Sequence, residues 1–125
     1  MNNLNYATLE ASKKLVKAGI VLETESVRYL QPDGHWRIAP KHDVGHLWRV
    51  LSMDVIPAPS MAEVWRELPE NVCDYYPILT IDEEETKAEY RDTLWNRLDN
   101  SQHRNTNPTD ALINLLIWVK GQVRC

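Results

Sequence analysis

The segment Ile56–Pro69 has the sequence IPAPSMAEVWRELP and carries the clearest structural signal in the chain. Its two early prolines favour an extended lead-in. Ser60 and Glu63 then have the spacing of a capping box, in which each side chain satisfies a backbone N–H of the first helical turn. Pro69 ends the helix because it lacks an N–H and restricts the residue before it. A helix this short cannot stand alone, so we expect it to dock through its apolar stripe. That stripe is Met61, Val64, Trp65 and Leu68.

Upstream of this segment, the sequence predicts a helix over Thr8–Ala18 and then a β-hairpin. Gly19 can take the positive φ that ends the helix, and Ile20 supplies the apolar contact of a Schellman motif. The predicted strands of the hairpin are Glu25–Gln31 and His35–Ala39, joined by a Pro-Asp-Gly turn.

Residues Lys41–Met53 carry an apolar stripe at helical spacing, with Asp43 as the candidate N-cap. His42 and His46 would share one face of that helix, at a spacing that lets two imidazoles hold one metal ion. A hydrolase of the HExxH type has glutamate after the first histidine, whereas this chain has aspartate. Catalytic zinc also needs a third protein ligand, and none is evident in the sequence. A metal-dependent hydrolase is therefore the alternative to two ordinary surface histidines.

Downstream, Tyr75–Ile81 alternates as a strand, and Pro77 restricts that strand to a sheet edge or lies among its first pairs. The segment Asp82–Asp99 fits two patterns, a charged helix or a turn followed by a strand, and periodicity does not separate them. We favour a small β-meander. The polar residues Asp99–Thr106 are expected to form a turn or loop.

The chain closes with a predicted helix over Pro108–Lys120, capped by Asn107 and ended by Gly121. Between Ala111 and Val119 only Asn114 is polar, so this helix is either buried on most sides or presents one side to a partner. The apolar run therefore predicts a homodimer as well as a core helix.

These elements predict an α+β fold in a small single domain over residues 1–125. It has an N-terminal helix, a β-hairpin, short helices, a small antiparallel meander and a C-terminal apolar helix packed on the sheet. Helices and strands do not alternate as βαβ units, so a doubly wound sheet is not expected.

Composition excludes several classes of protein. Hydrophobic residues make up 43% and charged residues 26% of the 125 residues, which excludes intrinsic disorder. No apolar run is long enough to span a membrane, and the polar N-terminus predicts no signal peptide. The 14 Lys+Arg and 18 Asp+Glu give a net charge of −4, which argues against broad nucleic-acid binding. Cys73 and Cys125 favour free thiols in a reducing cytoplasm, with a bridge between them as the alternative.

Three stretches together resemble a known family. They are LNYATLEASKKL from Leu4, IPAPSMAEVWRELP from Ile56, and NTNPTDALI with LIWV from Asn105. The chain resembles a family of small phage- and prophage-associated proteins of gut anaerobes that has no assigned activity. The resemblance implies a phage-type accessory protein, and it favours a strand over a helix near Thr86–Asp92.

The chain has five tryptophans and no phenylalanine. Trp48, Trp65 and Trp118 lie on or beside apolar stripes and are predicted to be core residues. Trp36 and Trp95 have polar neighbours and are the candidate anchors for a protein partner.

No complete catalytic constellation is evident, and the scattered glycines form no phosphate loop, so we expect no cofactor. Cys73 is followed by Asp74, which disfavours a reactive thiolate. The first hypothesis is thus a non-enzymatic protein-binding or regulatory module with an unidentified protein partner. A hydrolase using His42 and His46 is the alternative. A nucleic-acid binder is the weaker one, and it would use the basic residues around the hairpin with its tryptophans. Those basic residues are Arg28, Arg37, Lys41 and Arg49.

Overall fold

The structure is a computed structural model that describes residues 6–41 and 54–122. In that part of the chain, helices and two three-stranded antiparallel sheets form an α+β fold, as the sequence predicts. The helices are α1 (Leu9–Lys17), α3 (Met61–Glu67) and α4 (Pro108–Gln122). The strands are β1 (Ser26–Leu30), β2 (Trp36–Pro40), β3 (Val55–Pro57), β4 (Tyr76–Ile81), β5 (Thr86–Arg91) and β6 (His103–Asn105).

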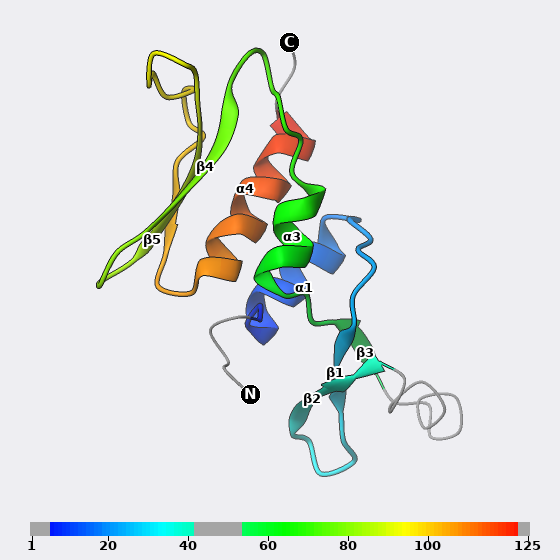
Figure 1. Cartoon of the computed structure of the whole chain (residues 1–125). Coiled ribbons are helices and arrows are strands. Elements are labelled where there is room, and N and C mark those ends of the chain that lie inside the picture. The colour runs from blue at the N-terminus through cyan, green and yellow to red at the C-terminus, as the bar shows by residue number, and fades with distance from the viewer. Residues whose placement is uncertain (1–5, 42–53, 123–125) are drawn as a thin grey trace.

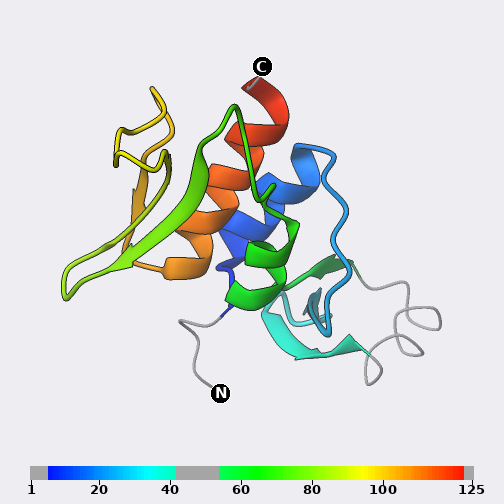
Figure 2. The ribbon, with the colours of Figure 1, turned by 45° about the horizontal axis from the view of Figure 1, so that its top comes forward.

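Helix α4 is the centre of the molecule. It packs on β5 and β6 on one side and on α1 and α3 on the other, an arrangement visible in Figures 1 and 2. The predicted docking of the C-terminal helix on the sheet is confirmed. The other sheet, with strand order β2-β1-β3, lies beyond the helices and touches them mainly through β3.

The apolar run of α4 forms the core. Five of its side chains have no exposed surface: Ala111, Leu112, Ile113, Leu115 and Leu116. These residues pack within their own chain, whereas Asn114, Ile117 and Trp118 of the same run are only partly buried. The homodimer stays a prediction.

Helix ends follow the sequence closely. The Thr8 hydroxyl caps α1 by accepting from the Ala11 N–H at 3.2 Å. Gly19 has a φ of 75°, and the Ile20 N–H donates to the Leu15 carbonyl at 3.3 Å, which completes the predicted Schellman motif. The capping box of α3 is also present.

Two further helix and strand expectations need correction. Gly121 does not end α4, because the helix continues through Gln122 and Gly121 does not take a positive φ. The segment expected to be a loop contains β6, whose three residues pair with β5. The polar side chains of β6 are tolerated because β6 is the edge strand of its sheet. Arg104, at its centre, is exposed to solvent.

The ambiguous segment after β4 is a turn and a strand. Asp82 turns the chain, since its carboxylate accepts from the backbone N–H groups of Glu84 at 3.0 Å and Glu85 at 2.9 Å. β5 follows and pairs with β4, so the meander is confirmed. The predicted helix over Lys41–Met53 lies almost wholly outside the described residues.

The two ends of the described chain are joined by side-chain hydrogen bonds. Asn107 caps α4 as predicted, since its Oδ1 accepts from the Thr109 N–H at 2.9 Å. The buried Asp110 carboxylate accepts from the Thr8 N–H at 2.9 Å and from the Thr8 hydroxyl at 2.7 Å. Because Thr8 starts α1 and Asp110 lies in the first turn of α4, these bonds fix the two helices to each other.

Candidate functional site

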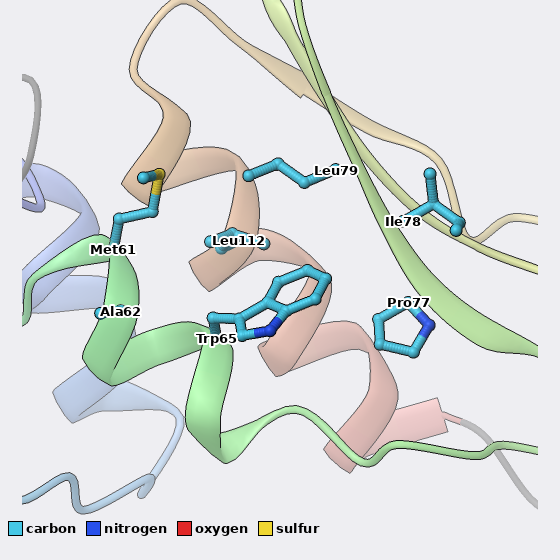
Figure 3. A pocket seen from close by; sticks show the side chains of 7 residues that line it. All are labelled: Met61, Ala62, Trp65, Pro77, Ile78, Leu79 and Leu112. Carbon is cyan, nitrogen blue, oxygen red and sulfur yellow. The ribbon is translucent and has the colours of Figure 1, made fainter.

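An apolar groove of about 570 Å³ lies between α3 and the edge strand β4 (Figure 3). One wall comes from α3, the other from β4, and a fully buried leucine of α4 forms the floor. The lining residues are Met61, Ala62, Trp65, Pro77, Ile78, Leu79 and Leu112. None of these described residues is titratable, so they offer no group for acid–base catalysis and suit apolar side chains instead.

The α3 wall is held in place by one carboxylate. Glu63 Oε1 accepts from the Ser60 N–H at 2.9 Å, closing the capping box, and its Oε2 accepts from the Glu25 N–H at 2.9 Å. One glutamate therefore joins the start of α3 to the residue before β1. This second bond ties the groove wall to the neighbouring sheet.

The far end of α3 is fixed to the β4–β6 sheet by Tyr90. This fully buried side chain donates from its hydroxyl to the Pro69 carbonyl at 2.9 Å. Burial raises the pKa of the Tyr90 hydroxyl, so it stays a donor at physiological pH. Since Tyr90 belongs to β5, beside β4, the bond also sets the spacing between the two walls.

Trp65 is the main exposed feature of the groove, and its placement corrects the sequence prediction. It was expected in the core, but 40% of its surface is exposed. The reason is that α3 has only seven residues, of which Val64 alone is buried, so the outer part of the stripe borders the groove. Figure 3 shows the indole lying between α3 and β4, with Leu112 of α4 behind the same space.

Three other tryptophans lie in the described part of the chain, and they differ in exposure. Trp95 is 60% exposed, and Trp36 is half-buried, with the Lys13 ammonium 5.3 Å from its ring centroid. Their partial exposure fits the sequence prediction, and their role as partner anchors stays a prediction. Trp118 is half-buried against the core, as expected, and Trp48 lies outside the described residues.

The structure leaves the metal hypothesis untested. His42 and His46 both lie outside the described residues. Within residues 6–41 and 54–122, no group of three His, Cys, Asp or Glu side chains is placed to hold a metal ion. A hydrolase centred on the two histidines stays a prediction.

Cys73 differs from the expectation of a free thiol. It packs half-buried against the main core, with a positive φ of 54°, and it is not a free cysteine. The turn after Asn71 brings it to the core, half-buried just before β4, which agrees with the expectation that it packs as a small apolar side chain. Cys125 lies outside the described residues.

The basic residues of the hairpin are partly engaged within the chain. The Arg28 Nη2 donates to the Ala7 carbonyl at 2.6 Å, and burial lowers the pKa of this guanidinium although Asp110 opposes the change. Arg37 Nε donates to the Gln31 Oε1 at 3.0 Å. Arg28 is thus directed toward the helices, which leaves fewer cations for a nucleic acid than the sequence suggested.

A second hollow, of about 630 Å³, lies between the C-terminal parts of α1 and α4. Lys14 and Lys17 lie on one side, and Trp118 lies on the other beside the His103 ring, 6.0 Å between centroids. This hollow has charged and polar side chains on its rim, whereas the described side chains that line the α3–β4 groove are apolar or aromatic.

Comparison with known proteins adds no relative. No protein-family model matches the chain, and no curated protein or solved structure matches it. The resemblance to phage-associated proteins therefore stays a prediction. No helix in the described part of the chain is long and apolar enough to cross a membrane.

Proposed function

We propose that this protein is a non-enzymatic binding module that holds an apolar segment of another protein in the α3–β4 groove. The observation that carries the proposal is Trp65, a large aromatic side chain that is 40% exposed on the wall of an otherwise apolar groove. Tryptophans in such positions are enriched among the residues that dominate binding energy at interfaces. A phage or prophage setting and a cytoplasmic location are compatible with such a module.

The construction of the groove supports the same proposal. Its walls are fixed to the rest of the fold by Glu63 and Tyr90, so the groove exists before a partner arrives. A preformed site loses little conformational freedom on binding, and more of the contact energy remains as affinity.

A selection from a library of random short peptides against the immobilised full chain tests the proposal. We expect enrichment of peptides with apolar or aromatic side chains. Trp65→Glu should weaken their binding about tenfold or more, because it places a charge where the apolar anchor lies. Ala62→Glu, on the same wall at an exposed helical position, should do the same without disturbing the core.

Trp95→Glu is the matched control, since Trp95 is a still more exposed tryptophan outside the groove. Circular dichroism establishes that each variant is folded. If no peptide is enriched, or if Trp95→Glu weakens binding as much as the groove variants do, the proposal is wrong.

A further inference from the structure

The backbone of β4 offers hydrogen-bonding groups on the side that borders the groove. Tyr90 lies opposite Pro77 in the β4–β5 ladder. Its carbonyl accepts from the Leu98 N–H at 2.9 Å and its N–H donates to the Ser101 hydroxyl at 3.2 Å, so both groups point away from β4. In an antiparallel ladder, residue pairs alternate between exchanging two hydrogen bonds and exchanging none. Pro77, Leu79 and Ile81 are therefore the positions that exchange none with β5.

The free edge of β4 consequently presents the N–H and C=O groups of Leu79 and Ile81, together with the C=O of Pro77. The turn agrees with this alternation. The Asp82 N–H, one residue after Ile81, points toward β5 and donates to the Glu85 carbonyl at 3.1 Å. Among the described residues no strand pairs with this edge of the sheet. Such an edge is a template for another strand.

The other sheet edges in the described part of the chain are shorter or are interrupted. β3 has three residues and ends in Pro57, and β6 has three residues with Arg104 at its centre. β2 carries Arg37 and ends in Pro40. By contrast, β4 has six residues, no charged side chain and one proline near its start. Charges, prolines and short length are the usual protections against strand addition, and the β4 edge has the fewest of them.

We propose that the partner's segment binds as an extended strand that pairs antiparallel with β4 and turns alternate side chains into the groove. This inference rests on the proposed function and specifies how the segment binds. Directly opposed residues in a sheet point their side chains to the same face. Leu79 packs against the core, so a residue paired with Leu79 faces α3 and its exposed Trp65.

The recognised sequence follows from this register. The segment carries apolar side chains at two positions, two residues apart, opposite Leu79 and Ile81. The residue between them points to the other face of the sheet and is unrestricted. The peptide residue opposite Pro77 can donate to the Pro77 carbonyl but has no N–H to accept from. We therefore expect the sequence preference of the peptide to be weaker at the position opposite Pro77.

Backbone methylation of an enriched peptide distinguishes strand addition from other modes. Replacing one N–H at a time by N–CH₃ should weaken binding about tenfold at alternating positions and little at those between, because only every second N–H meets β4. Uniform tolerance of methylation, or apolar requirements at helical spacing, overturns strand addition while the proposed function stands. Absence of any enriched peptide overturns both.

A pair of substitutions in β4 examines the protein side of the same contact. Ile81→Pro removes an edge-facing N–H, whereas Ile81→Ala keeps that N–H and shortens a side chain that is 57% exposed. We expect Ile81→Pro to weaken peptide binding several-fold more than Ile81→Ala. Equal effects contradict the backbone pairing. Light scattering tests whether the chain forms a concentration-dependent dimer. A dimer that prevents peptide binding would mean that a second copy pairs with the β4 edge, and it would overturn the proposal.

Discussion

The two sheets of this protein have the same strand arrangement but different support. Each has a central strand with an antiparallel neighbour on either side. The β4–β6 sheet lies on α4 and contributes the fully buried Ala88 and Tyr90 to the main core. The β1–β3 sheet has its own small cluster, in which Val27 is the buried member among the described residues, with Tyr29, Ala39 and Val55 packed around it.

This difference explains where an unprotected edge can be kept. A sheet that stands on a helix holds its register through the core, so its edge is free to meet a partner. A sheet with little support of its own depends on pairing within the chain, and its two edges carry prolines or a charge. The exposed apolar edge occurs where the groove lies and not on the other sheet.

The largest effect is expected from a substitution that weakens the packing of the β4–β6 sheet on α4. Leu116→Ala removes a fully buried side chain from α4 and leaves a cavity in the core. The free energy of unfolding should fall by about 2–5 kcal/mol. Urea denaturation followed by circular dichroism measures the loss, and a change below about 1 kcal/mol would mean that α4 is not the common support described above.

A matched pair of substitutions compares the two regions directly. Val64→Ala in the main core and Val27→Ala in the β1–β3 sheet delete the same atoms from residues that are 0% and 5% exposed. We expect losses of about 2 kcal/mol at Val64 and about 1 kcal/mol at Val27, because the smaller cluster can relax around the deletion. Native-state hydrogen exchange should also be faster in β1 than in β5. Equal losses and equal protection would remove the distinction between the sheets.

The smallest expected effect concerns the turn that closes the β4–β5 hairpin. Hydrogen bonds from the Glu85 and Glu84 N–H groups lower the pKa of the Asp82 carboxyl below 3.8. A lowered pKa in the folded state stabilises the turn above pH 3.8, and this contribution is lost as the pH falls through the folded pKa. An NMR titration should give a midpoint below 3.8 for Asp82, with the Glu85 amide following it. In Asp82→Asn the Glu85 amide should lose this transition, and a midpoint at or above 3.8 would contradict the turn geometry.

Much of the fold follows from local chemistry that the sequence displays. Caps at Thr8, Ser60 and Asn107 form because a side-chain oxygen near a helix start satisfies a free N–H regardless of the rest of the fold. The Pro-Asp-Gly turn and the edge position of the Pro77 strand follow for the same local reasons. β6 could not be found this way, because its residues are polar and its stability comes from pairing with β5 and not from a local sequence signal.

The candidate site was harder to predict than the fold. Both elements of the groove were expected, but their closeness depends on the bonds of Glu63 and Tyr90 to other parts of the chain. An apolar stripe indicates only that a face is covered, and it does not separate a core from a groove. Trp65 was therefore assigned to the core. The signal that could have indicated otherwise is the combination of a two-turn helix with an apolar strand that Pro77 keeps at an edge.

The bond between Thr8 and Asp110 joins residues that are 102 positions apart, and this has a consequence for synthesis. At about 5–20 residues per second, Thr8 is added to the nascent chain roughly 5–20 s before its partner Asp110. During that interval the apolar sides of α1 and α3 have no central helix to pack on. Until α4 is made, the nascent chain thus exposes apolar surface of α1 and α3 that the finished protein covers, and this surface is open to chaperones and to aggregation.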